Sequence, residues 1–102
     1  MSYTLIKTDK AMKSMQDILH FILYNFDEDT ALERIDELED SISKLSENPY
    51  MGKIAPDRTL AEQGYRVLIT SKDYVFYKVY DRSEEVVVFL VVDQRQDYLK
   101  ML

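Results

Sequence analysis

The sequence predicts an α+β fold in which an antiparallel helical hairpin packs on an antiparallel β-meander, with a short N-terminal strand and a short C-terminal tail. Two observations predict it. Apolar residues recur at steps of three and four between residues 9 and 48, whereas residues 65–92 hold three segments rich in β-branched and aromatic residues. A chain of 102 residues suffices for one modest core, so we expect a single domain spanning residues 1–102.

The first helix is expected from Asp9 to Asn25, after a short strand at Tyr3–Lys7. Thr8-Asp9 is a favourable helix start. The apolar stripe of this helix comprises Met12, Met15, Ile18, Leu19, Ile22 and Phe26.

The second helix is expected to start at Thr30, which forms a capping-box pattern with Glu33, and to stop before Pro49. Its stripe comprises Ala31, Ile35, Leu38, Ile42 and Leu45. Because only a few residues separate the two helices, they should form an antiparallel hairpin.

Residues 50–64 contain both glycines of the chain and Pro56, and they are expected to form a connecting loop with a turn or a weak strand. Three strands follow, at Tyr65–Ile69, Tyr74–Tyr80 and Val86–Val92. The middle strand alternates, with Val75, Tyr77 and Val79 on one face and Tyr74, Phe76, Lys78 and Tyr80 on the other. We expect Tyr74, Phe76, Tyr77 and Tyr80 to leave an aromatic patch that the helices do not cover, available to a partner.

The last strand consists of seven consecutive apolar residues, which indicates an interior strand with neighbours on both edges, covered by Ile35, Leu38 and Ile42. Residues 93–97 should then emerge at the end of the sheet. Tyr98, Leu99, Met101 and Leu102 should fold back as a short amphipathic tail. We expect truncation after Asp93 to leave a folded domain.

Charge is unevenly distributed along the chain. The net charge is −6, and residues 1–50 hold 5 basic and 11 acidic side chains, whereas residues 51–102 hold 8 of each. An acidic surface repels phosphate, so any contact with nucleic acid falls to the second half. With no cysteine and a single histidine, His20, a metal centre or a Cys-His or Ser-His-Asp site is not expected. The lack of a long apolar stretch or a secretory signal favours the cytoplasm and no membrane partner.

The candidate functional residues lie on or beside the strands: Tyr65, Arg66, Tyr77, Arg95 and Tyr98. Arg66 opens the first strand of the meander, and Arg95 follows the last. The first and third strands of a meander run in the same direction, so the two arginines start at opposite ends. The alternative is a structural role, in which the arginines pair with Asp73, Asp93 or Asp97 at the sheet edges.

The order of elements, together with "NPYMG", "GYRVLI", "DYVFYKVY" and "VVVFLVVDQRQDYLKML", resembles the RelE/ParE superfamily of toxins from bacterial type II toxin-antitoxin modules. The resemblance implies a growth-arresting toxin with a cognate antitoxin protein as partner, and it allows a homodimer. ParE-like members inhibit DNA gyrase, and RelE-like members are endoribonucleases that cleave mRNA on the ribosome. An inactive or redirected relative that acts as a binding protein is the third alternative.

The resemblance assigns roles to single residues. Arg66 matches an arginine that stabilises charge on the scissile phosphate in nuclease members, and Arg95 matches the arginine at the end of the last strand. Fixed guanidinium groups suit the charge that develops in RNA cleavage. Proton transfer would then fall to Lys53 or Tyr98, with Glu47 and Tyr65 as further candidates.

The C-terminal histidine of nuclease members and their lysine-rich surface have no counterpart here, so the resemblance favours ParE-like action. The residues expected to bind the target are then Tyr65, Arg66, Arg95, Gln96 and Asp97. No cofactor or metal is implied.

Overall fold

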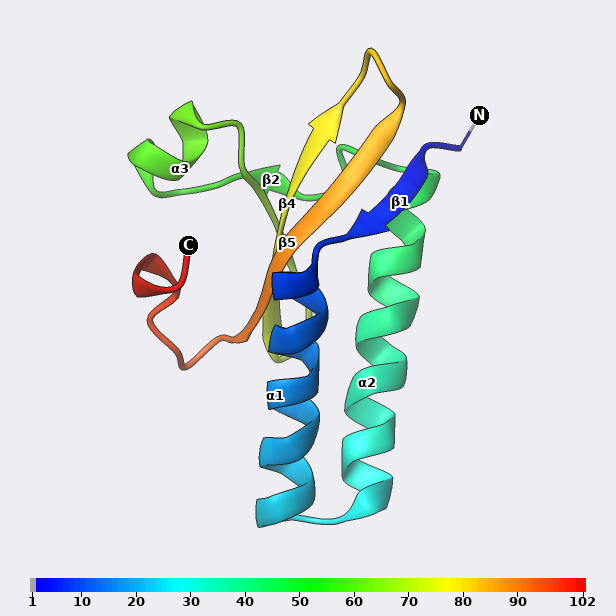
Figure 1. Cartoon of the computed structure of the whole chain (residues 1–102), viewed down its shortest axis with the longest axis vertical. Coiled ribbons are helices and arrows are strands. Elements are labelled where there is room, and N and C mark those ends of the chain that lie inside the picture. Colours follow the sequence, from blue (N-terminus) through cyan, green and yellow to red (C-terminus); the bar gives the residue numbers. More distant parts are fainter. Residues whose placement is uncertain (1) are drawn as a thin grey trace.

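The computed structural model describes residues 2–102 and has the predicted α+β architecture (Figure 1). Its helices and strands within this range are β1 (Thr4–Lys7), α1 (Asp9–Asn25), α2 (Glu28–Ser43), the 3-10 turn η1 (Lys44–Ser46), β2 (Lys53–Ile54), α3 (Arg58–Glu62), β3 (Arg66–Ile69), β4 (Asp73–Tyr80), β5 (Glu85–Asp93) and the 3-10 turn η2 (Tyr98–Lys100). The predicted bounds of the first helix are confirmed without change.

The strands form one sheet in the order β1-β5-β4-β3-β2. The meander β3-β4-β5 is antiparallel as predicted, and β1 adds to it in parallel through the register Thr4↔Glu85 to Lys7↔Val88. β5 therefore has neighbours on both edges, which confirms its prediction as an interior strand.

Beyond the end of β1, Thr8 before α1 and Ser14 of α1 form hydrogen bonds with the edge of β5. The Thr8 amide donates to the Val88 carbonyl at 3.0 Å, and the Val91 amide donates to the Ser14 hydroxyl at 3.0 Å. Ser14 is buried within the apolar stripe of the helix. Its hydroxyl satisfies a strand amide that would otherwise be unpaired, which explains a polar residue at a core position.

α2 begins earlier than the sequence predicted. Asp27, not Thr30, caps the helix, because its carboxylate accepts the Thr30 amide at 2.7 Å. This start also places Glu28 and Asp29 in the first turn, where negative charge is favoured by the helix dipole. The regular helix ends at Ser43, and η1 completes it ahead of Pro49.

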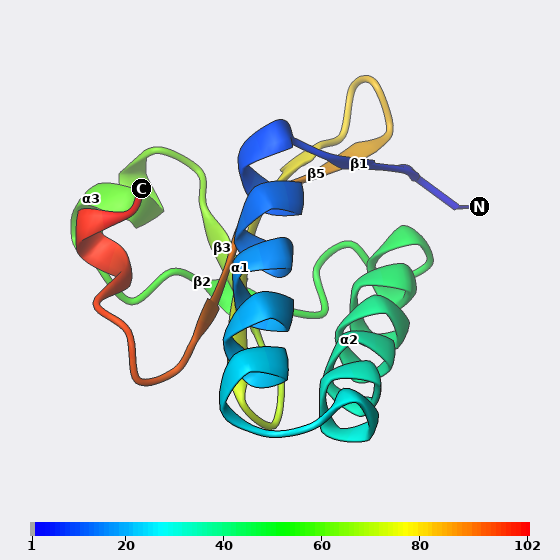
Figure 2. The ribbon, with the colours of Figure 1, turned by 60° about the horizontal axis from the view of Figure 1, so that its bottom comes forward.

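Each face of the sheet carries its own apolar cluster, which confirms the predicted alternation along β4. The helix face joins α1 and α2 to the sheet and includes Ile18, Leu38, Ile42, Val75, Tyr77, Val86, Val88 and Val91, with Ile35 packed against it. The opposite face holds Leu60, Val67, Phe76, Leu90 and Val92, against which Tyr98, Met101 and Leu102 pack. Figures 1 and 2 show α3 and the C-terminal tail together on this second side.

The expected aromatic patch is wrong for two of its four members. Phe76 is 1% exposed and Tyr77 is 0% exposed. Tyr77 faces the helices, and Phe76 is covered by the Tyr98 ring at a centroid distance of 4.8 Å. Tyr74 is half-buried beside Tyr98, which leaves Tyr80 as the exposed member. The tail therefore belongs to the second cluster, and it contributes more to the core than we expected.

The short helix α3 lies within the stretch predicted as a loop. The Asp57 carboxylate caps it by accepting the Leu60 amide at 3.0 Å, and Leu60 inserts into the second cluster. Five residues are too few to show helical periodicity, so a sequence pattern does not reveal such an element. The predicted weak strand in the same stretch is β2.

Candidate functional site

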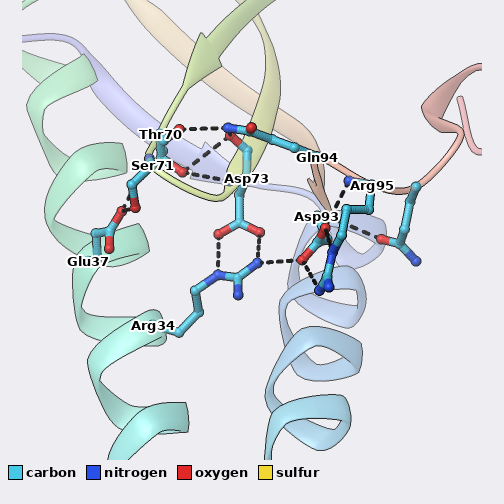
Figure 3. Close-up of polar contacts among 9 residues, drawn as sticks. Arg34, Glu37, Thr70, Ser71, Asp73, Asp93, Gln94 and Arg95 are labelled. Carbon is cyan, nitrogen blue, oxygen red and sulfur yellow. Dashed lines mark hydrogen bonds and ion pairs between the residues drawn. The ribbon is translucent and has the colours of Figure 1, made fainter.

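The carboxyl end of β5 is held by a chain of alternating charges, shown in Figure 3. Arg34 on α2 donates to both carboxylate oxygens of Asp73 through Nε and Nη2, and its Nη2 donates a further hydrogen bond of 3.0 Å to Asp93. Asp93 in turn accepts from Arg95 Nε at 2.9 Å and from Arg95 Nη2 at 3.0 Å. The side chains of Arg34 and Asp73 are 10% and 1% exposed, whereas that of Arg95 is 77% exposed. The network therefore runs from the interior to the surface.

The network controls ionisation at its outer end. The hydrogen bond from the Arg95 guanidinium lowers the pKa of Asp93 well below its usual range, with a further contribution from Arg34. Asp93 in turn raises the pKa of Arg95. Both groups are therefore charged at neutral pH, and Arg95 presents a fixed cation.

The neighbours of Arg95 hold the chain where it leaves the sheet. Gln96 accepts the Asp93 amide at 3.2 Å, and Gln94 donates to the Thr70 carbonyl at 2.7 Å. Asp97 caps η2 by accepting the Leu99 amide at 3.2 Å. Gln96 and Asp97 are exposed, so they combine local bonds with access from solvent.

Arg66 lies in a different environment, on the helix face of the sheet. Its register partner on β4 is Tyr77, and its guanidinium donates to the Gly52 carbonyl at 2.6 Å and stacks over the Tyr50 ring at 5.0 Å. The Tyr77 hydroxyl accepts the Gly52 amide at 2.9 Å. A Cβ at Gly52 would lie 2.6 Å from a backbone oxygen, so glycine is required here. Arg66 thus fastens the loop that leads into β2.

A pair of tyrosines extends this cluster to the β4–β5 turn. The Tyr3 hydroxyl donates to Asp81 at 2.8 Å, and the Tyr50 hydroxyl donates to the other oxygen of the same carboxylate. The bond to Asp81 raises the pKa of Tyr3 to about 12 and also raises that of Tyr50. Both phenols therefore stay protonated and serve as donors.

Lys53 and Tyr98 lie on the opposite face, where they line one small hollow of about 80 Å³. Its other walls are Pro56, Val67, Ile69, Tyr74 and Phe76. Tyr65 lies on the same face and packs edge-on against Phe89 at 5.5 Å, with the Lys78 ammonium 4.4 Å above the Tyr65 ring. Burial raises the pKa of Tyr65, which disfavours it as a proton acceptor at neutral pH.

The predicted site residues are therefore divided among three places. Lys53 and Tyr98 meet at the hollow on the second face, and Arg66 lies on the helix face. Arg95 lies beyond the end of β5. On β4, Tyr77, the register partner of Arg66, lies four positions after Asp73, the register partner of Asp93. This corresponds to about 13 Å along the strand.

A larger groove of about 520 Å³ lies between α1 and the C-terminal tail. Apolar side chains form its floor: Ile18, Phe21, Ile22, Val91 and Met101. Asp17, Arg34, Asp93, Arg95 and Gln96 form its polar rim. The groove opens beside Arg95, so the exposed arginine and an apolar recess share one surface.

Sequence reasoning missed Arg34 and the groove. Arg34 is the one basic residue among the acids of residues 27–40, and this isolation was the available signal. Within residues 2–102, no three His, Cys, Asp or Glu side chains converge as metal ligands. No helix in this range is long and apolar enough to cross a membrane.

Comparisons with known proteins place these features in a family. No curated protein matches the sequence. The chain superposes on the ParDE toxin-antitoxin system of P. aeruginosa with a TM-score of 0.75 at 16% identity, covering 90% of this chain and 96% of that one. It also superposes on the RelBE2 toxin-antitoxin complex of Mycobacterium tuberculosis with a TM-score of 0.66 at 21% identity, covering 92% and 100%.

A third solved structure is the isolated E. coli RelE toxin, with a TM-score of 0.62 at 16% identity over 98% of this chain and 93% of that one. At these identities the superpositions establish the fold. The family model for the ParE toxin of the type II toxin-antitoxin system parDE matches residues 5–98. This chain therefore belongs to the ParE toxin family of type II toxin-antitoxin systems.

Proposed function

We propose that this toxin arrests growth by binding DNA gyrase, as ParE-like toxins do, and that a cognate antitoxin protein neutralises it. The observation that carries the proposal is the division of the candidate nuclease residues. Arg66 lies on the helix face and is bound by carbonyl oxygens, whereas Lys53 and Tyr98 lie on the other face. RNA cleavage requires a phosphate-binding cation and proton-transfer groups around one phosphate.

Binding requires only an exposed, preorganised surface, and the end of β5 offers one. Arg95 is exposed and is oriented by Asp93, which the buried Arg34 holds in turn. Gln96 and Asp97 extend this surface. Arg95 is therefore the residue we assign to target binding, with its orientation set from the interior of the protein.

The second candidate function is RelE-like cleavage of mRNA on the ribosome. One observation favours it: Lys53 and Tyr98, two candidates for proton transfer, line the same hollow. The walls of that hollow are otherwise apolar, and Lys53 is the one charged side chain among them. A cleavage site here would have to stabilise phosphate charge with a single lysine.

The two functions differ in what is damaged when the protein is induced in cells. Gyrase binding predicts induction of the DNA damage response, filamentous cells, and loss of supercoiling activity when the purified protein is mixed with gyrase. Cleavage predicts transcripts cut within codons on stalled ribosomes. Intact gyrase activity together with cut transcripts would refute the first proposal, and a protein that causes neither effect is an inactive or redirected relative.

Two arginines provide a matched test of the surface. Arg95→Ala should abolish gyrase inhibition, because Arg95 is the cation at the end of β5. The control is Arg58→Ala on α3. Arg58 is also exposed, at 91%, and pairs within its own helix with Glu62, so inhibition should persist. Equal inhibition by both variants would remove Arg95 from the binding surface.

A further inference from the structure

We infer that Asp73 is a positioning residue for target binding, because it fixes the orientation of Arg95 through two intervening side chains. Those side chains are Arg34 and Asp93, and Figure 3 shows all four residues in order. This role rests on the proposed function in one respect, since Arg95 is taken there as the residue that meets the target. Asp73 is 1% exposed and is too buried to touch a partner, so its effect has to pass through the side chains between it and the surface.

The outer link is the pair between Arg95 and Asp93. The Arg95 side chain is 77% exposed, and an exposed arginine that is left alone samples many rotamers. Two hydrogen bonds to Asp93, from Nε at 2.9 Å and from Nη2 at 3.0 Å, select one of them. Other carboxylates are close in the fold or the sequence, since Asp17 lines the same groove as Arg95 and Asp97 follows it by two residues. The orientation of the Asp93 carboxylate therefore decides where Arg95 points.

The middle link orients that carboxylate. Its oxygen Oδ2 accepts Nη2 of Arg34 at 3.0 Å as well as Nη2 of Arg95. Its oxygen Oδ1 accepts the Arg95 backbone amide at 2.8 Å and Arg95 Nε. Within residues 2–102, Arg34 is thus the one donor to the Asp93 side chain besides Arg95 itself. Without Arg34, the carboxylate would be held only by the residue that it orients, and the two side chains could turn together.

The inner link fixes Arg34. The Arg34 side chain is 10% exposed and donates to both oxygens of Asp73 through Nε and Nη2. Asp73 is the first residue of β4, where it lies opposite Asp93 in the register with β5 and its amide donates to the Thr70 hydroxyl at 3.0 Å. The sheet therefore holds Asp73 in place, and Asp73 holds Arg34. One planar guanidinium binds two carboxylates here, which the compact ammonium of a lysine does not reproduce.

Energetics favour positioning over stability alone as the role of the buried pair. Apolar residues in place of a buried ion pair often leave stability unchanged or raise it. Asp73 faces α2 on the same side of β4 as Val75 and Tyr77, where an apolar residue would continue the core. Arg34 is the one basic residue of α2, and it points inward. An apolar pair could fill this space, but it could not orient an arginine at the surface.

The decisive variant is Arg34→Met/Asp73→Leu, which replaces the whole buried pair by apolar side chains. Because both charges leave together, we expect the domain to stay folded, which urea unfolding checks. The readout is the heteronuclear NOE of the Arg95 Nε–H group, which reports side-chain motion on the ps–ns timescale. We expect a high value in the native chain and, in the variant, a fall to the value of Arg58, which is 91% exposed and bonded to Glu62 within its own helix. A native Arg95 as mobile as Arg58, or an Arg95 that stays rigid in the double variant, would overturn the inference.

Two single variants on α2 complete the test. Arg34→Lys keeps the charge but loses the planar fork, so it should release Arg95 as well, and it decides the question if the double variant does not fold. Ile42→Val removes one buried methylene from the same helix without touching any of the ion pairs, so Arg95 should stay rigid. A rigid Arg95 in Arg34→Lys would overturn the inference. Equal mobility in Ile42→Val would do so too, because general loosening of α2 would then set the orientation of Arg95.

The same variants are compared in the gyrase supercoiling assay. We expect half inhibition by the double variant to need an about tenfold higher concentration, because the target must then immobilise Arg95 itself. Ile42→Val should stay within about twofold of the native chain. Unchanged inhibition by a double variant with a mobile Arg95 would overturn the inference. If the native chain does not inhibit gyrase, the proposed function fails, whereas the NMR comparison still decides whether Asp73 positions Arg95.

Discussion

Replacing Arg34 by methionine should destabilise the protein strongly, because Asp73 would lose its counter-ion in the interior. The substitution replaces the arginine stem by an unbranched apolar side chain and removes three hydrogen bonds, two to Asp73 and one to Asp93. Asp73 is 1% exposed, so water does not replace them. Breaking a buried ion pair costs about 3–5 kcal/mol. Because Asp93 keeps Arg95, we expect the lower end, about 3 kcal/mol.

The assay is urea unfolding followed by far-UV circular dichroism, and thermal unfolding should show a midpoint about 15 °C lower. The double variant Arg34→Met/Asp73→Asn removes the unpaired charge and should recover part of the loss. Arg58→Ala is the control for loss of an exposed arginine, with an effect below about 0.5 kcal/mol.

A loss of less than about 1 kcal/mol in Arg34→Met would refute the reasoning, because it would mean that Asp73 is solvated or finds another partner. A double variant no more stable than the single one would also contradict it. In that case the cost would come from lost packing of the arginine stem, and not from the buried charge.

Three further predictions concern the loop, the tail and acid stability. Gly52→Ala should cost about 1–3 kcal/mol in urea unfolding, because its Cβ would lie 2.7 Å from the Tyr77 hydroxyl, whereas Gly64→Ala, in open space at φ +90°, should cost about 1 kcal/mol. Tyr98→Ala should cost about 2 kcal/mol by opening the second cluster, and Leu99→Ala, at a 53% exposed side chain, should stay within about 0.5 kcal/mol; equal effects would mean that the tail is loosely held. The pKa of Asp93 is lowered in the folded state, so its contribution to stability is present above the unfolded pKa of about 4 and is lost as the pH falls. Asp93→Asn should therefore weaken the fall in the free energy of unfolding at acid pH. An unchanged pH dependence would contradict this.

The helices and the meander were predictable because their signals are local. The stripe and start of α1 lie within one helix, and the seven apolar residues of β5 indicate burial without knowledge of the neighbours. α3 and the tail were not predictable as cover for the sheet. Leu60 and Tyr98 meet the same cluster from segments far apart in sequence, so neither segment alone shows what it covers.

The site was only partly predictable for a related reason. Sequence indicated that Arg95 follows the sheet and named Asp93 as a partner, and the ion pair between them shows that the structural alternative holds for this contact. Arg34 could not be identified, because 39 residues separate it from Asp73 and no periodic pattern relates a helix position to a strand end. Long-range pairing of this kind depends on the packing angle of α2 on the sheet.

The alternation of side chains along β3, more than distance, separates Arg66 from the residues that would assist it in a nuclease. Successive side chains of a strand point to opposite faces of the sheet, so Arg66 and Val67 lie on different faces. Val67 pairs with Lys53 and faces Tyr98, while Arg66 faces Tyr77 and the helices. No change of rotamer carries a side chain across a sheet, and a shift of β3 by one residue would turn Val67 out of the second cluster. Any cleavage chemistry at the hollow must therefore proceed without Arg66, whereas binding through Arg95 requires no such rearrangement.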